Sequence, residues 1–503
     1  MRPAALACCS SHSLKRIIRH ARDEEGLAVL IALIALSVFS LLGMYMTLNA
    51  TTEVRISDNY ESRVQASLAA AAGLNHAREA MRGMPFDIQL NGPDGAHNST
   101  STYVNFAQSY AYRNPLDWML ARSLNIANPS ADLAGISDDG VLNTGTFGGA
   151  SGLSLIPLSG IVYSQANPNG AGTATVSRYF TKASNNHLDA TEPLHDPFID
   201  SDHIIIVRSM GVARTLREVS GGVTRLNSVV VYEARFRQRN TFDLDAPFVV
   251  EGSEVDSYAE KMWDGAAFRI DGGPSNFGIA TIDTDPSDAA QPATEITNRL
   301  ENQNQANRID GLGASPSIAD ITAAVQADED KRLLRDPNFL WNLVYNLVPQ
   351  FADIRSVGYT HWTGGSAPDL GFIDPDKPYN DPSQRPKVTW VNGDLDIGGN
   401  VSGGGLLVVT GKLEGNGSLQ FNGLVLVVGG GTLDGSGLNV GIEGGLFLAK
   451  LTMTDGVASF DTPSFTWRGN SDVIMNSEAI RMGMRLLPPE QLSWREITGI
   501  IDP

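Results

Sequence analysis

The chain has 503 residues, of which 42% are hydrophobic and 18% are charged, so it is globular overall and long enough for more than one structural unit. A formal net charge of −19 opposes contact with nucleic-acid phosphates, and no nucleic-acid partner is expected. The two cysteines, Cys8 and Cys9, are adjacent and close to the N-terminus, which excludes a disulfide framework for the rest of the chain.

An apolar stretch near the N-terminus is long enough to cross a membrane. After Glu25 no charged side chain occurs until Glu53. About 26 uncharged residues would form a helix roughly 39 Å long, and the hydrocarbon core of a bilayer needs about 20. Basic residues flanking such a span stay in the cytoplasm, and here they precede it: Arg2, Lys15, Arg16, Arg19 and Arg22. The C-terminal bulk is therefore expected outside the cytoplasm.

The helix is predicted to continue well past the apolar stretch. A secretory signal peptide would have a shorter apolar core followed by a cleavage site, whereas this span is longer and no helix breaker follows it. Apolar residues then recur every four positions, which predicts an amphipathic segment: Ile56, Tyr60, Val64, Leu68 and Ala72. One helix over 27–82 is predicted, with a transmembrane half and an amphipathic half, ended by Gly83 and Pro85.

This N-terminal pattern resembles the type III signal of type IV pilins and pseudopilins, in which a short basic leader and a glycine precede a long, half-apolar helix. In that class the prepilin peptidase cleaves after the glycine, so the resemblance implies processing between Gly26 and Leu27. Residues 59–66 and 71–77 are similar to the N-terminal domain of PilX-type minor pilins. The resemblance covers residues 20–82. It implies the peptidase, inner-membrane lipid and other pilins or pseudopilins as partners.

The sequence departs from the major pilins at two positions. These usually carry an aromatic residue at the first mature position and Glu at the fifth, where this chain has Leu27 and Ile31. PilX-type pilins and the K-type minor pseudopilin of type II secretion share this kind of departure, which suits a tip or initiating subunit. A plain signal anchor holding an envelope domain is the alternative.

Residues 83–245 predict an irregular α+β region. A helical patch is expected over 115–126 and a strand over 160–164. Residues 204–211 and 227–237 predict an antiparallel pair of strands. By analogy with pilins, this pair would cover the amphipathic half of the long helix.

Residues 246–384 predict short strands with a helical insertion. Strands are expected at 248–250 and 267–270, followed by a polar link over 290–308. Ser317 is expected to cap a helix that runs to about residue 335. Pro337 would break it, and a second helix is predicted over 338–348.

The C-terminal block, residues 385–503, is rich in glycine. Apolar runs that begin at Gly405, Gly423 and Gly445 recur at spacings of about 18 and 22 residues. This period predicts a parallel β-solenoid whose strands are buried on both faces, and an antiparallel meander is the alternative. The strands near residues 249 and 270 are expected to join the same solenoid.

The predicted fold class is therefore α+β: a long N-terminal pilin-like helix, an antiparallel β region and a C-terminal parallel β-solenoid-like domain. The predicted segments are a leader (1–26), the helix (27–82), the α+β region (83–245), strands with a helical insertion (246–384) and the Gly-rich domain (385–503).

Candidate chemical sites are few. Asp394 and Asp396 would point the same way on a strand, as catalytic carboxylates do, but no histidine lies near them in sequence. Two acidic loops offer oxygen ligands for structural Ca²⁺: Asp196, Asp200 and Asp202, and Asp283, Asp285 and Asp288. Solvated loops are the simpler interpretation, so no catalytic residue, metal or cofactor is predicted.

The sequence therefore predicts a non-enzymatic minor pilin of the bacterial inner membrane, which joins or primes a type IV pilus or pseudopilus, reaches its tip and serves in assembly or cell adhesion. The alternatives are a K-type pseudopilin of type II secretion and an anchored, polysaccharide-active β-solenoid enzyme.

Overall fold

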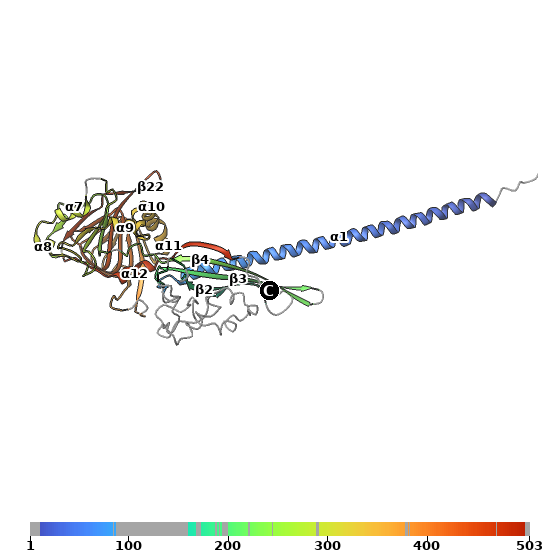
Figure 1. Ribbon diagram of the computed structural model, residues 1–503, viewed down its shortest axis with the longest axis horizontal. Coiled ribbons are helices and arrows are strands. Elements are labelled where there is room, and N and C mark those ends of the chain that lie inside the picture. The colour runs from blue at the N-terminus through green and yellow to red at the C-terminus, as the bar shows by residue number, and fades with distance from the viewer. Residues whose placement is uncertain are drawn as a thin grey trace, which may run out of the picture.

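The computed structural model in Figure 1 describes residues 11–83, 85–86, 159–166, 173–186, 189–190, 192–193, 200–219, 222–243, 245–287, 291–377, 381, 383–468 and 470–497. The helical patch expected over 115–126 lies outside the described residues, as do Asp196 and Asp288.

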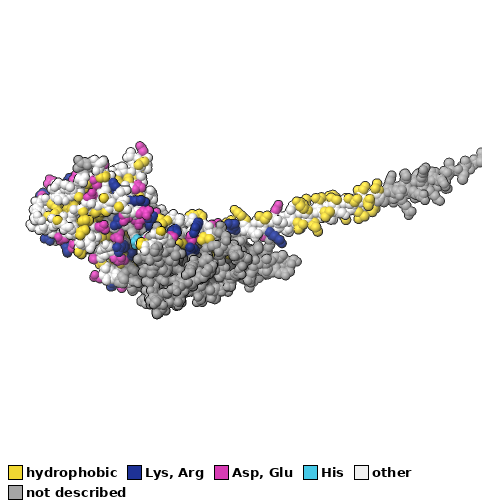
Figure 2. Space-filling view, in the orientation of Figure 1, with side chains coloured by type: hydrophobic (Ala, Val, Ile, Leu, Met, Phe, Trp, Pro, Cys, Tyr) yellow, Lys and Arg dark blue, Asp and Glu magenta, His cyan; other side chains and the backbone are white. Residues whose placement is uncertain are grey.

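A single long helix, α1 (Ser11–Ala80), projects from the rest of the protein (Figure 1). It confirms the predicted continuous helix, although it begins before Leu27 and passes through Gly26. A turn follows it, in which Gly83 has a φ of 81°. The large apolar side chains from Leu27 to Leu48 are all between 46% and 71% exposed, and they form the continuous yellow surface in Figure 2.

This exposed half is long and apolar enough to cross a membrane. In the part of the chain that the structure describes, α1 is the one helix that meets this condition. The stretch carries no charged side chain, and its few polar residues include Ser37 and Thr47, whose hydroxyls bond to the helix's own carbonyls. It is compatible with a membrane anchor.

The second half of α1 lies on an antiparallel sheet. Its strands are β1 (Ser159–Ala166), β2 (Thr173–Asn185), β3 (Ile204–Val219), β4 (Gly222–Arg237) and β25 (Glu490–Ile497), in the order β1-β2-β3-β4-β25. The predicted strands at 160–164, 204–211 and 227–237 are confirmed as parts of β1, β3 and β4. β3 and β4 form the predicted antiparallel pair, and both contact α1.

The face of α1 that packs on this sheet is not the predicted one. Small, fully buried residues face the sheet: Ala66, Ala69, Ala70 and Ala77. The predicted apolar stripe points away, since Ile56, Tyr60 and Leu68 are 63%, 71% and 59% exposed. The reason is steric. The helix backbone passes so close to Gly211 on β3 that a Cβ there would overlap the backbone of Ala66 and Ala70.

Between β4 and β25 the chain forms two mainly parallel sheets. The larger contains β5 (Phe248–Glu251), β8 (Arg269–Asp271), β9 (Ile279–Ile282), β10 (Ile309–Asp310), β11 (Ile318–Asp320), β12 (Ile354–Val357), β14 (Gly371–Phe372), β15 (Arg385–Asn392), β17 (Asn400–Val409), β19 (Ser418–Gly429), β21 (Asn439–Thr454), β22 (Val457–Asp461) and β24 (Asp472–Met475). The smaller contains β6 (Asp256–Ser257), β7 (Trp263–Asp264), β13 (Thr360–Trp362), β16 (Leu395–Ile397), β18 (Lys412–Gly415), β20 (Thr432–Gly435) and β23 (Ser464–Arg468). In the described residues neither sheet closes on itself.

The three glycine-led runs pair in parallel, which excludes the antiparallel meander. Gly405 pairs with Gly423, and Gly423 pairs with Gly444 rather than with the predicted Gly445. The reason is conformational. Gly405, Gly423 and Gly444 have φ angles of 128°, 138° and 144°, a backbone region open mainly to glycine. The three strands are therefore aligned at the glycines that share this backbone conformation. The apolar runs that follow the glycines are less regular in length.

The larger parallel sheet is buried on both faces, as predicted. One face meets the smaller sheet in a core that includes Leu407, Val425 and Leu395. The other face is covered by helical segments: α9 (Thr322–Ala327), a 3₁₀ turn (Lys331–Arg335), α10 (Pro337–Asn342), a π turn (Leu343–Leu347), α11 (Val348–Phe351) and α12 (Ser477–Arg485). Such burial explains why these strands are apolar without alternation.

Two local predictions are wrong. Ser317 does not cap a helix. It is buried before β11, where its hydroxyl accepts from the N–H of Gly278 and donates to the carbonyl of Leu312. The helix begins only at Thr322, because β11 first pairs with β9. The segment predicted as a polar link, 290–308, contains two short helices, α7 (Pro292–Asn298) and α8 (Gln303–Ala306). The buried residues of these helices include Ile296 in α7 and Gln305 in α8.

Glu251 on β5 is fully buried, and in the described part of the chain neither of its carboxylate oxygens has a hydrogen-bond partner. Burial raises the pKa of this carboxyl well above its usual range, and the charge of Arg335 offsets part of the effect. A neutral, protonated Glu251 therefore suits the folded state.

We expect replacement of Gly211 by Ala to loosen α1 from the sheet. The added methyl group would overlap the helix backbone, at a cost of about 1–3 kcal/mol. Amide hydrogen exchange over 66–77 should accelerate in the full-length chain. Gly365→Ala is the matched control, since no atom lies within 4 Å of the new methyl group. Equal exchange in the two variants would contradict the proposed close contact.

We expect Glu251→Gln to flatten the pH dependence of stability. A raised folded-state pKa gives stability that is complete below the unfolded value and is lost as pH rises through the folded value, with a slope of up to about 1.4 kcal/mol per pH unit. Denaturant unfolding from pH 4 upward, roughly the ordinary range for Glu, measures this slope. Glu254→Gln, at an exposed position, is the control and should keep the wild-type slope.

Candidate functional site

The predicted processing site lies on the exposed part of α1. Gly26 is within the helix, and the next residue, Leu27, is 57% exposed. Ile31, at the position where major pilins usually carry Glu, is 58% exposed on the same apolar surface. All three positions belong to the part of the chain before the first buried residues of α1, and Figure 1 shows α1 projecting away from the sheets.

Polar contacts hold the other half of α1 to the sheet. The hydroxyls of Ser67 and Tyr232 are 2.6 Å apart, and Nδ1 of His76 is 2.6 Å from the hydroxyl of Tyr179. Arg63 forms a 3.0 Å ion pair with Glu496 on β25. These contacts anchor both flanks of the helix to the sheet and define which of its faces remains free.

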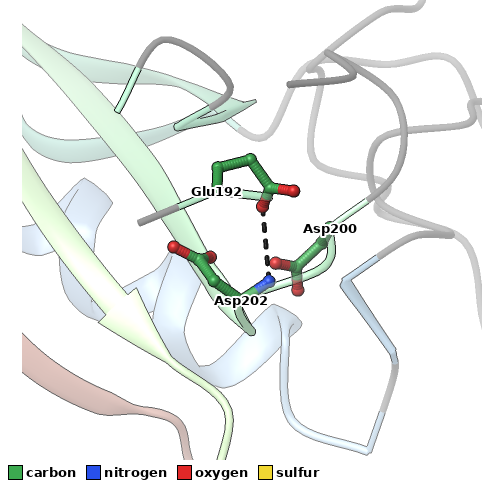
Figure 3. Close-up of side chains that lie close together, drawn as sticks. All are labelled: Glu192, Asp200 and Asp202. Carbon is green, nitrogen blue, oxygen red and sulfur yellow. Dashed lines mark hydrogen bonds between the residues drawn. The ribbon is translucent and has the colours of Figure 1, made fainter. Parts of the chain in front are cut away.

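One acidic loop brings three carboxylates together. Glu192, Asp200 and Asp202 have oxygens that all lie within 4.8 Å of one another (Figure 3). Of the predicted residues, Asp200 and Asp202 are therefore confirmed as neighbours. Glu192 was not predicted, and nothing in its local sequence distinguishes it from a surface acid. Hard cations such as Ca²⁺ bind oxygen ligands of this kind.

The same carboxylates already hold the loop together. Glu192 is fully buried and accepts hydrogen bonds from the Ser201 hydroxyl and from the backbone N–H groups of Ser201 and Asp202, the latter drawn in Figure 3. Asp200 and Asp202 both accept from the N–H of Ile204, at 3.1 and 3.0 Å. The cluster thus fixes the loop at the point where β3 begins.

In the described part of the second acidic loop, which excludes Asp288, the side chains are not gathered in this way. An oxygen of Asp283 accepts from the N–H of Asp285, and an oxygen of Asp285 accepts from the N–H and hydroxyl of Ser287. Each carboxylate closes its own turn. Among the described residues, only the Glu192 cluster places three potential ligands within 4.8 Å.

Asp394 and Asp396, which the sequence places two residues apart, have different partners in the structure. Asp394 precedes β16, and its carboxylate accepts from the backbone N–H of Lys412 at 2.8 Å. Asp396 lies within β16 and accepts from the hydroxyl of Tyr359 at 2.5 Å and contacts Nδ1 of His361 at 2.8 Å. A histidine is therefore beside Asp396 although it is distant in sequence, because β13 and β16 pair in parallel.

No protein-family model and no curated protein matches this sequence. Among solved structures, the competence-associated pilin ComZ from Thermus thermophilus aligns with 12% sequence identity over 87% of this chain and 98% of that chain, at a TM-score of 0.16. A TM-score this low does not establish a shared fold, so the functional argument depends on the geometry of the chain itself.

We expect Glu192→Ala to destabilise the loop before β3. The change leaves the N–H groups of Ser201 and Asp202 without their acceptor, which typically costs about 1–3 kcal/mol. Hydrogen exchange at Ser201 and Asp202 should rise. Glu254→Ala, at an exposed position, is the control. Unchanged exchange in the Glu192 variant would show that the carboxylate does not hold the loop.

Proposed function

We propose that this chain is a non-enzymatic, membrane-anchored minor pilin of the PilX type, which joins or primes a type IV pilus or pseudopilus. The observation that carries the proposal is the two-part character of α1. From Leu27 to Ala50 it exposes large apolar side chains and no charged one over a length that suits a bilayer, and its C-terminal part lies on an antiparallel sheet. A helix of this kind serves both as an anchor and as an assembly element.

The free face of α1 supports assembly with other helices. Beyond the bilayer-length segment, Ile56, Tyr60 and Leu68 remain exposed, and Trp494 on β25 is 59% exposed. An apolar face of this length on a protein outside a membrane marks a contact surface. Other pilins or pseudopilins, bound through their own N-terminal helices, are the partners that we propose for it.

Processing between Gly26 and Leu27 by the prepilin peptidase would complete this assembly element. It would remove the basic leader, leave a net charge of about −21, and start the mature helix at an apolar residue. Ile31 offers no carboxylate for a bond to a neighbouring subunit's N-terminus, which favours a tip or initiating position. The protein would lie in the bacterial inner membrane, with its bulk outside the cytoplasm.

We further propose that residues 248–475 form a β-solenoid that this subunit carries outward. The support is the parallel register. Leu395, Leu413 and Leu433 follow one another across the smaller sheet, and Val401, Leu419 and Val440 do so across the larger. The separate roles of Asp394 and Asp396 weaken the case for a pair of catalytic carboxylates.

The mature N-terminus tests the proposed function. In cells that contain a prepilin peptidase, peptide mapping of the membrane fraction should find a chain that starts at Leu27. Gly26→Val should retain the leader, whereas the control Gly43→Val, at a helical position with free space around it, should be processed normally. A native chain that keeps its leader would reduce the protein to a plain membrane anchor.

A further inference from the structure

Two exposed tyrosines lie at opposite ends of a row of polar side chains on the outer face of the smaller parallel sheet. Tyr359, just before β13, is 65% exposed, and its hydroxyl donates to Asp396. Tyr258, which follows β6, is 44% exposed, and its hydroxyl lies 2.8 Å from Nζ of Lys412 on β18. β13 and β6 are at opposite edges of this sheet, so the two tyrosines reach the strands between them from opposite edges.

The polar side chains between the rings follow the strand register. We call His361, Asp396, Glu414 and Lys412 the polar row. His361 pairs directly with Asp396, and Asp396 pairs directly with Glu414. Neighbouring strands lie about 4.8 Å apart, so these groups repeat at that interval. Gly398 leaves room for the imidazole ring, because a Cβ there would overlap it.

Tyr258 extends over the face of the sheet. Its backbone N–H bonds to the carbonyl of Phe465 on β23, whereas its ring lies 4.7 Å from Nζ of Lys412 on β18. The strand order is β16-β18-β20-β23-β6, so the side chains of Tyr258 and Lys412 together span β20 and β23. Tyr258 thus adds a partly exposed aromatic ring beside the polar row.

The polar row contains two carboxylates, Asp396 and Glu414, and one lysine, Lys412. Glu414 forms an ion pair with Lys412, and Asp396 contacts Nδ1 of His361. The hydrogen bond from Tyr359 lowers the pKa of Asp396, so this carboxylate stays ionised and accepts hydrogen bonds. Two carboxylates stand beside the single lysine, so the row disfavours an anionic ligand and offers acceptors to hydroxyl groups. The charge of −19 on the chain opposes a polyanion.

We propose that the polar row, Tyr359 and Tyr258 bind a neutral, β-linked polysaccharide along the outer face of this sheet. The C–H faces of sugar rings pack on aromatic rings, and sugar hydroxyls bond to paired carboxylates and ammonium groups. An extended β-linked chain repeats its sugar units at an interval close to the strand spacing, so successive units meet successive strands. This binding goes beyond the proposed pilin-like role and does not depend on it.

Titration of the full-length chain in detergent with hexasaccharides tests the proposal. The probes are β-linked glucose and β-linked N-acetylglucosamine hexamers, with a polygalacturonate hexamer as the anionic comparison. We expect at least one neutral hexamer to bind. Tyr359→Ala and Tyr258→Ala should each weaken its binding about tenfold through loss of a ring surface, and Asp396→Asn should weaken it through loss of acceptor strength.

Two further variants keep the test decisive. Trp494→Ala removes an aromatic side chain of similar exposure from the antiparallel sheet, and this variant should bind the hexamer as the wild type does. Tyr359→Phe keeps the ring, removes only the hydrogen bond to Asp396, and should retain most of the binding. Failure of both neutral hexamers to bind would overturn the proposal, as would binding that both Tyr→Ala variants leave unchanged or equal binding of the anionic hexamer. Such a failure would leave the N-terminal processing result untouched.

Discussion

The structure depends on one close contact, the passage of the α1 backbone over Gly211 of β3. Small side chains at Ala66 and Ala70 bring the helix axis near the sheet, and the absence of a side chain at residue 211 permits it. This contact fixes the rotation of α1 about its axis. The rotation in turn decides that Tyr60 and Leu68 point away from the sheet and continue the apolar surface of the membrane half. Packing within the body and the surface offered to other helices are thus set by the same few residues.

The end of α1 also joins the antiparallel sheet to the parallel block. Arg82 donates to the carbonyls of Leu486 and Phe351, and the N–H of Gly83 bonds to the carbonyl of Arg485. Arg78 donates to the carbonyl of Pro489, just before β25. The last turn of α1 and the turn that follows it therefore contact the helical cover of the larger parallel sheet as well as the antiparallel sheet, so the projecting helix is tied to both.

Much of this architecture could be predicted from the sequence, because the signals are local. The continuous helix follows from an apolar stretch without a breaker, the β3–β4 pair from two apolar runs around glycines, and the parallel pairing from the repeated runs after Gly405 and Gly423. The predictions that failed concern contacts between residues far apart in the sequence. The buried face of α1 was mistaken because an alanine face is a weaker signal than a stripe of Ile, Tyr and Leu, although close approach to a sheet requires small residues.

The candidate sites show the same limit. Glu192 joins Asp200 and Asp202 only through the fold of the loop, and His361 joins Asp396 only because strands 35 residues apart in sequence pair in register. The strand β25 could not be expected from its position either, since it follows the Gly-rich block but pairs with β4. Local periodicity identifies elements, whereas partners across a parallel sheet depend on the lengths of the intervening turns.

The return of the chain to β4 makes the parallel block an insertion between two neighbouring strands. The two connecting segments are held side by side: Arg239 donates to the carbonyl of Pro488, and Arg481 pairs with Asp243. The parallel block therefore begins and ends at one place, beside the antiparallel sheet. A change in the number of its strand repeats, whose paired glycines Gly405, Gly423 and Gly444 are about 18–21 residues apart, would alter the length of the block and leave both of its ends at the same place on the antiparallel sheet. The contact between α1 and that sheet would then be independent of how far the block extends.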